Sequence, residues 1–182
     1  MDKPIIQGLA GTETEKNLQT ALRAESAVWL RYMCAARTAS EESYCGIAET
    51  FTSIADNERA HGEIWLRLLG GCGNTEAHLR EACSGEHREW EEMYAGFAET
   101  AKREGFAQIA QLFAHVASVE RSHEETFGGW LRMMADGKIF YGAEGTVWRC
   151  LNCGFLFVGK EPPSECPACS HPRAFFVRNQ NA

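Results

Sequence analysis

Residues 56–61 read Asp-Asn-Glu-Arg-Ala-His, and residues 120–124 read Glu-Arg-Ser-His-Glu. Each stretch places a glutamate three residues before a histidine, within a long segment whose apolar residues recur every three or four positions. That spacing is typical of the amphipathic helices of a bundle. In both segments the glutamate and the histidine fall on the apolar stripe, so both pairs are predicted to face the interior. The repeated motif therefore predicts a helical bundle with metal-binding side chains in its core.

Four long helices are predicted from the apolar periodicity. The first half of the chain contains helices over residues 14–38 and 44–69, and the second half contains helices over residues 85–103 and 106–135. The connection at residues 74–84 has room for a short helix of its own. Each half thus offers one helix with an inward carboxylate and one helix with Glu-x-x-His. This is the sequence pattern of a duplicated helical hairpin.

The predicted ligands of the bundle are five glutamates and two histidines. Burial of an ionised carboxylate costs several kcal/mol unless it is paired or coordinated, so two metal ions are expected to compensate for these charges. One Glu from each of two helices and Glu-x-x-His from two others form the di-iron or di-manganese site of ferritin-like bundles. Ligands rich in oxygen, with two imidazoles, suit iron or manganese better than structural zinc. The residues predicted as metal ligands and as the catalytic set are Glu25, Glu58, His61, Glu89, Glu92, Glu120 and His123.

The spacing along the sequence also bears on the roles of Glu92, Tyr32 and His87. Glu92 follows Glu89 by three residues and is predicted to share its helix face. Tyr32 follows Glu25 by seven residues on the same face, where it is either a core aromatic residue or a hydrogen-bond donor to a metal-bound carboxylate. His87 is not part of a repeated metal-ligand motif, so it is expected on the surface or in helix packing.

The C-terminal segment contains two Cys-x-x-Cys pairs. Cys150 and Cys153 are followed, after twelve residues, by Cys166 and Cys169. This spacing strongly indicates a tetrathiolate metal site, but it does not decide between iron and zinc. Iron is favoured because a redox-active centre could supply electrons to a neighbouring di-metal site, whereas zinc could not. The segment 147–182 is too small to bury a core alone and needs the metal as a staple.

The predicted organisation is a bundle domain over residues 1–137, a linker over 138–146 and a small β domain over 147–182. The net charge of −7 argues against a nucleic-acid or anionic-membrane partner, because both need a basic face. No apolar run approaches the roughly 18 to 20 residues that span a bilayer, and residues 1–10 lack the apolar core of a signal peptide. A cytoplasmic protein is therefore expected. Its remaining cysteines are expected to be free thiols without an assigned role: Cys34, Cys45, Cys72 and Cys83.

With these motifs the chain closely resembles the rubrerythrin family over nearly its whole length. The resemblance implies a ferritin-like four-helix di-iron domain joined to a rubredoxin-like iron domain. Two Fe would lie in the bundle and one Fe would be held by the four cysteines, with Zn as a possible substitute there. The matching motifs are Thr14–Asn17, Asp56–His61, Gly85–Glu89, Glu92–Tyr94, Glu120–Glu124, Trp148–Gly154 and Cys166–Pro172.

The resemblance also implies an activity. Rubrerythrins reduce hydrogen peroxide to water as a defence against oxidative stress, with electrons from an NADH-dependent reductase, often through a rubredoxin. It implies a homodimer, and an exchange of Glu92 and His61 as iron ligands between the oxidised and reduced states. Two alternatives stay open on the residues alone. One is an iron-storage protein, which the built-in electron relay argues against, and the other is a zinc-ribbon interaction module on a metal-stabilised bundle.

Overall fold

The computed structural model describes residues 6–179, and the chain separates after Asn74 into two compact units. The first five residues, which belong to the segment searched for a signal peptide, and residues 180–182 lie outside this range. The described chain is mainly helical and ends in a small three-stranded sheet, as the sequence predicts. None of its helices is long and apolar enough to cross a membrane.

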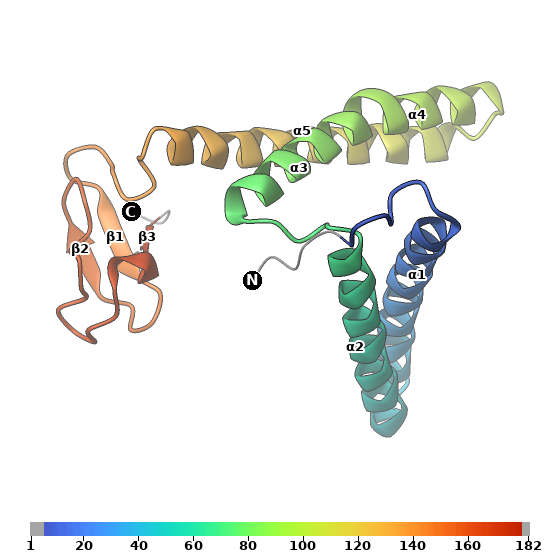
Figure 1. Cartoon of the computed structure of the whole chain (residues 1–182), viewed down its shortest axis with the longest axis horizontal. Helices are drawn as coiled ribbons and strands as arrows, with labels where there is room; N and C mark the ends of the chain where they lie inside the picture. Colours follow the sequence, from blue (N-terminus) through green and yellow to red (C-terminus); the bar gives the residue numbers. More distant parts are fainter. Residues whose placement is uncertain (1–5, 180–182) are drawn as a thin grey trace. The chain divides into compact units, whose positions relative to one another are not determined.

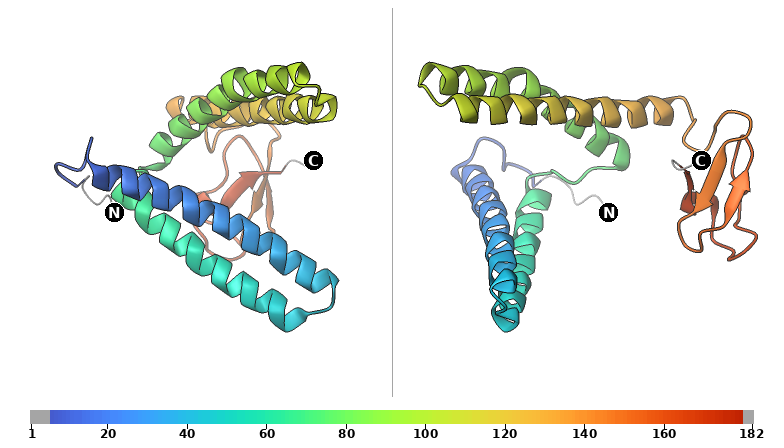
Figure 2. Two further views of the ribbon diagram at one scale, coloured as in Figure 1. Left: turned by 90° about the vertical axis from the view of Figure 1, so that its right-hand side faces the viewer. Right: turned by 180° about the vertical axis from the view of Figure 1, so that it is seen from behind.

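The first unit is a helical hairpin. Helix α1 spans Glu13–Glu41 and helix α2 spans Cys45–Leu68, and the two run side by side (Figures 1 and 2). Helix α1 starts where Thr12 accepts a hydrogen bond from the backbone N–H of Glu15, at 3.1 Å, which satisfies one of the free donors of the first turn. The predicted helices at residues 14–38 and 44–69 are thus confirmed, with small shifts at their ends.

The second unit begins with another hairpin, whose first arm is longer than predicted. This arm runs without a break through α3 (Thr75–Arg88), a π-helical turn η1 (Glu89–Met93) and α4 (Tyr94–Arg103), and it packs against α5 (Ala107–Ala135). The prediction of a helix that starts at Gly85 is wrong, because the preceding connection is itself the beginning of the arm. A glycine inside a helix costs only about 1 kcal/mol, which tertiary packing overcomes.

Both hairpins turn in the same way. Tyr44 precedes α2 with φ −91° and ψ 60°, and Phe106 precedes α5 with φ −90° and ψ 61°. Each backbone N–H donates to the carbonyl five residues earlier, at 2.7 and 2.8 Å, and each follows a residue of positive φ, Ser43 at 68° or Gly105 at 88°. In both halves the Glu-x-x-His motif starts 14 residues after this turn residue. The duplicated hairpin inferred from the sequence is therefore also a repeat of backbone geometry.

A three-stranded antiparallel sheet with the order β2-β1-β3 forms the C-terminal part. Its small core contains Trp148 and Phe176, which are almost completely buried together with Cys150 and Cys166. The elements are β1 (Val147–Cys150), β2 (Leu156–Val158), a 3-10 turn (Arg173–Phe175) and β3 (Phe176–Arg178).

The segment predicted as a linker is tied to the sheet. The Arg178 guanidinium donates to the carbonyls of Lys138, at 3.3 Å, and Tyr141, at 2.5 Å. The backbone N–H of Gly142 donates to the Lys160 carbonyl at 2.7 Å. These bonds anchor the connecting segment to the β part of the chain at several points.

Candidate metal centres

The first hairpin gathers Glu25 from α1 with Glu58 and His61 from α2. The Nδ1 atom of His61 lies 3.1 Å from Glu58 Oε2 and 4.0 Å from Glu25 Oε1. One potential ligand atom from each residue lies within 4.8 Å of the others, as a metal ion would require. Glu58 and His61 share a face because three residues make nearly one helical turn, and the packing of α1 on α2 adds Glu25.

The second hairpin repeats this arrangement with Glu86 from α3 and with Glu120 and His123 from α5. His123 Nδ1 lies 2.7 Å from Glu120 Oε2 and 3.6 Å from Glu86 Oε2, and the three ligand atoms again lie within 4.8 Å of one another. The two histidines are 51% and 49% exposed in their side chains. The two hairpins therefore present nearly equivalent groups of two carboxylates and one imidazole.

Glu86 belongs to the second candidate group but was not among the ligands predicted from the sequence. Glu58 follows Glu25 by 33 residues, and Glu120 follows Glu86 by 34, whereas it follows Glu89 by only 31. The spacing within the repeat was thus a usable signal that pointed to Glu86. The five other members of the two groups were all among the predicted ligands.

Glu89 and Glu92 lie outside these two groups, and their role as ligands stays a prediction. Glu89 opens the π-helical turn, is partly buried and lies close enough to Glu86 to contribute to its raised pKa. Glu92 is exposed. A π-helical turn closes its hydrogen bonds over five residues instead of four, so residues three apart no longer share a face as they do in an α-helix. Glu89 is therefore the better placed of the two.

The carboxylates of each group interact strongly. A hydrogen bond with Glu58 raises the pKa of Glu25, and burial adds to the rise. The same bond lowers the pKa of Glu58, with help from His61. In the second hairpin, burial raises the pKa of Glu86, followed by repulsion from Glu120. Each pair thus favours a shared proton in the metal-free chain, and a cation in that place would relieve the same repulsion.

Two of the aromatic side chains in the first hairpin, Tyr32 and Trp65, bear on the predicted site. Tyr32 packs on Phe51 with ring centroids 5.7 Å apart, which is the core role that the sequence left open; its role as a donor to a ligand stays a prediction. The indole nitrogen of Trp65 is buried and has no hydrogen bond of good geometry within the described chain. This nitrogen is nevertheless near enough to the Glu25 carboxylate to favour its charged form, which offsets part of the rise in the pKa of Glu25.

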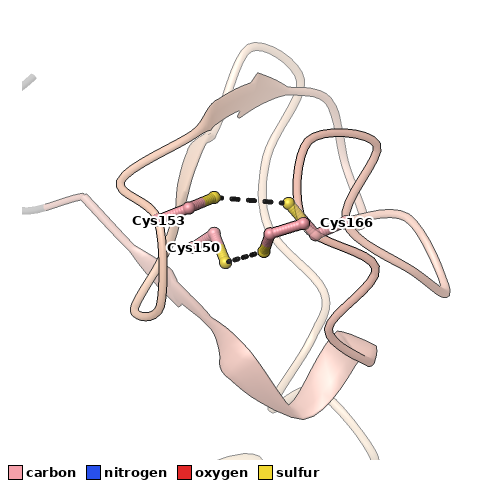
Figure 3. Close-up of side chains that lie close together, drawn as sticks. Cys150, Cys153 and Cys166 are labelled. Atoms are coloured by element: carbon pink, nitrogen blue, oxygen red, sulfur yellow. Dashed lines mark hydrogen bonds between the residues drawn. The ribbon is translucent and has the colours of Figure 1, made fainter.

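Four cysteines converge at the C-terminal sheet (Figure 3). The sulfur of Cys150 lies 3.8 Å from that of Cys169, and the sulfur of Cys153 lies 3.7 Å from that of Cys166. All four sulfurs lie within 4.8 Å of one another, as a tetrahedral thiolate site requires. The predicted ligand set is thus assembled in one place.

Two similar backbone turns present these thiols. Gly154 donates its N–H to the Cys150 carbonyl and Ser170 donates its N–H to the Cys166 carbonyl, both at 2.9 Å. Gly154 adopts a left-handed backbone, with φ 79°, and Ser170 adopts φ 57° at the equivalent position. A residue with a side chain is uncommon in this conformation, so the backbone of the second turn is slightly strained. A metal bound to the cysteines of both turns would help to stabilise it.

The thiols differ in acidity. The Phe155 backbone lowers the pKa of Cys153, but its contacts with the other thiols and its burial outweigh this effect and raise the value to about 12. A hydrogen bond with the His171 backbone is the main reason that the pKa of Cys169 falls to about 6. A metal would bind all four as thiolates and replace the protons that they share. The remaining cysteines of the described chain are free, as predicted: Cys34, Cys45, Cys72 and Cys83.

Comparison with known proteins agrees with both centres. A family model described as Rubrerythrin matches residues 16–131, and a second model, of the rubrerythrin rubredoxin-like domain, matches residues 148–177. The chain is 37% identical to rubrerythrin of Porphyromonas gingivalis, over 93% of this chain and 92% of that protein. It is 36% identical to rubrerythrin of Nitratidesulfovibrio vulgaris, over 94% and 96%.

Two further similarities add less. The chain is 38% identical to a putative rubrerythrin of Methanocaldococcus jannaschii, over 90% of this chain and 91% of that protein. A solved structure of mixed-valence nigerythrin is 22% identical and covers 93% of this chain and 90% of that one, with a TM-score of 0.36. A score this low supports no conclusion about the arrangement of the helices.

Proposed function

The chain belongs to the rubrerythrin family, and from this premise we propose that it is a non-haem di-iron peroxidase that reduces hydrogen peroxide to water. The observation that carries the proposal is the presence, on one chain, of two equivalent Glu-Glu-His groups and a tetrathiolate site. Carboxylates and imidazoles suit iron in the first two groups, and four thiolates suit a single iron in the third. The cofactors are thus a di-iron carboxylate site and a rubredoxin-like iron.

The charge of the two hairpin groups fits this assignment. Glu25, Glu58, Glu86 and Glu120 together carry four negative charges when ionised, which match two ferrous ions. A hydrogen bond with Glu58 raises the pKa of Glu25, and burial raises the pKa of Glu86, so full ionisation of each group is disfavoured without a cation. The two half-exposed histidines leave room for a small substrate beside each group.

The reaction balances with two electrons and two protons for each peroxide, and its product is two waters. When bound, the di-iron pair supplies the two electrons that cleave the O–O bond, and the tetrathiolate iron returns them singly. The carboxylates and imidazoles hold the metal and leave positions open for peroxide. The Cys150, Cys153, Cys166 and Cys169 thiolates hold the relay centre.

The partners follow from this proposal. The electron donor would be an NADH-dependent reductase or a rubredoxin, and the enzyme would work as a cytoplasmic homodimer in the defence against oxidative stress. Glu89 and Glu92 remain candidates for additional ligands, and Tyr32 for a hydrogen-bond donor beside them. A rival iron-storage function has no use for a tetrathiolate relay, so that centre favours the peroxidase.

Anaerobic metal analysis combined with a peroxide assay tests the proposal. The purified chain should contain three irons, one of them with the visible absorption of a ferric tetrathiolate. After full reduction it should consume one peroxide for each di-iron site in a single turnover, and it should turn over continuously with NADH, a reductase and rubredoxin. A reduced, iron-loaded chain that leaves peroxide intact would disprove the proposed activity.

A further inference from the structure

The π-helical turn at Glu89–Met93 is held by side chains of the opposite helix. The indole N–H of Trp90 donates to Glu124 Oε2 at 2.5 Å. His87 Nδ1 lies 3.2 Å from both carboxylate oxygens of Glu124. Arg121 lies over the Trp90 ring, 5.5 Å from its centroid. We call His87, Trp90, Arg121 and Glu124 the Glu124 clamp.

The clamp is compact as well as hydrogen-bonded. The His87 and Trp90 rings meet edge to face, with centroids 5.4 Å apart and an interplanar angle of 88°. Glu124 is only 27% exposed, so water competes weakly for its oxygens. One carboxylate therefore binds two side chains of the other arm at once. These bonds fix how the arm that contains the π-helical turn sits against α5.

The position of the clamp in the sequence connects it to the metal group. Three residues of the clamp directly follow a group member or a predicted ligand. His87 follows Glu86 and Glu124 follows His123, and Trp90 follows the predicted ligand Glu89. Adjacent residues on a helix point in different directions, so the clamp bonds the helices on one side and the ligands lie on another. Movement of the clamp would thus shift the backbone at three site residues together.

The first hairpin has no equivalent clamp. Ser26 follows Glu25, and its hydroxyl donates to the Leu22 carbonyl of its own helix. Gly62 follows His61, and even a Cβ added there would make only an ordinary contact with the Glu25 Cβ, at 3.8 Å. Two regular helices set the ligand positions there. In the second hairpin, by contrast, the π-helical turn contains an extra residue that interrupts the regular helix, and the Glu124 clamp supports it from the opposite helix.

We propose that Glu124 is a positioning residue which, by bonding Trp90 and His87, keeps Glu86 beside Glu120 and His123. The inference rests on the proposed function, because it assumes that this group holds one of the two irons. Groups that orient metal ligands typically account for 10- to 100-fold in metal affinity. Loss of the clamp should therefore weaken one iron and leave the other in place.

The test uses the full chain loaded anaerobically with ⁵⁷Fe(II). Mössbauer spectra resolve the ferrous sites, and competition with a ferrous chelator measures their affinity. Glu124→Ala should weaken one non-thiolate iron by about tenfold and change one ferrous doublet, while the thiolate iron keeps its spectrum. Glu91→Ala is the matched control, since it removes the same charge from an exposed position in the π-helical turn, and it should leave both doublets unchanged.

Two further variants separate positioning from general stability. Glu124→Gln keeps an oxygen that can accept the Trp90 N–H and should restore most of the affinity. Trp90→Phe keeps the ring and removes only the donor, so it should change the same doublet as Glu124→Ala. A lower Tm with both doublets and affinities intact, in Glu124→Ala and Trp90→Phe alike, would overturn the inference. A wild-type chain that binds only the thiolate iron would overturn the proposed function and the inference with it.

Discussion

The two hairpins present the same three ligand types at similar distances, but they do so by different means. In the first, Glu25 and Glu58 come from uninterrupted α-helices that pack closely at Gly62. In the second, the arm that carries Glu86 contains a π-helical turn, and a clamp of polar side chains braces it. The similarity of the two ligand groups therefore does not require similar support.

A single residue accounts for much of this difference. The turn residue Tyr44 follows Glu25 by 19 residues, whereas Phe106 follows Glu86 by 20. A hydrogen bond that spans five residues absorbs one extra residue, so the π-helical turn keeps both ends of the longer arm in register. It also places Glu89, which has no counterpart in the first hairpin, near Glu86. One added residue thus makes a symmetric repeat unequal.

The largest effect is expected when both hairpins lose a ligand. Glu58→Ala combined with Glu120→Ala should abolish both non-thiolate irons, because each group then keeps a single carboxylate. The tetrathiolate iron should remain, since its ligands lie in a separate part of the chain. Iron analysis and the visible spectrum measure the two outcomes. Three irons in the double variant would show that the hairpin groups are not the di-iron ligands.

Glu86→Gln should affect only the second hairpin, and in opposite directions with and without metal. It should remove one iron, because a neutral amide is a poor ligand. In the metal-free chain it should raise Tm at pH 7, where the charged Glu86 is disfavoured by burial and by Glu120.

The sign of the pH dependence follows from the raised pKa of Glu86. The raised pKa of Glu86 stabilises the folded, metal-free chain below the ordinary pKa of 4.5. This contribution is lost as the pH rises through the raised pKa. The advantage of Glu86→Gln in metal-free protein should therefore shrink as the pH falls toward 4.5. Thermal unfolding of both proteins across this range measures it. An advantage that grew at low pH would contradict the stated environment of Glu86.

A comparison of Glu89→Ala with Glu92→Ala tests the asymmetry of the second hairpin. Glu89→Ala should weaken iron binding by about tenfold or more, because Glu89 is partly buried and near Glu86. Glu92→Ala should change the affinity by about twofold or less, as exposed substitutions usually do. Equal losses would favour the set predicted from the sequence, in which both residues bind metal.

The smallest effect is expected at Gly62. An alanine there would meet Glu25 and Leu22 at 3.8 Å, an ordinary contact, and would gain up to about 1 kcal/mol of helix propensity. Gly62→Ala should therefore raise Tm slightly and leave iron binding unchanged. A loss of iron would show that the first hairpin depends on a tighter approach than the structure describes.

The sequence predicted those parts of the sites whose ligands are close in the chain. Glu58 with His61, and Glu120 with His123, are pairs on one helix, where a three-residue spacing defines the geometry. The four thiolates follow from two local turns, including the positive φ of Gly154. Glu25 was also found, because α1 is regular and its apolar stripe keeps phase.

Prediction was weaker where the helix is irregular or where two helices must be aligned. Glu89 and Glu92 were predicted as ligands on a regular helix from Gly85, but the arm starts at Thr75 and contains a π-helical turn that changes the phase. Glu86 joins the group that the structure forms, and metal binding by Glu89 and Glu92 stays a prediction. His87 was expected on the surface or in helix packing, and it contacts Glu124 of the opposite helix, 37 residues further along the chain, a partner that the sequence did not identify. Such contacts depend on the relative register of two arms, which apolar periodicity does not determine.

The bonds that tie the connecting segment to the sheet have an entropic consequence. Arg178 holds two carbonyls of this segment, and Lys160 holds the Gly142 N–H. Ordering a free residue costs about 1 to 2 kcal/mol of backbone entropy, and that cost is already met here during folding. If the tetrathiolate site relays electrons as proposed, fewer backbone rotations would remain to be frozen when it docks against an electron acceptor. The affinity of this docking should consequently be limited more by the required orientation of the two proteins than by the loss of chain flexibility.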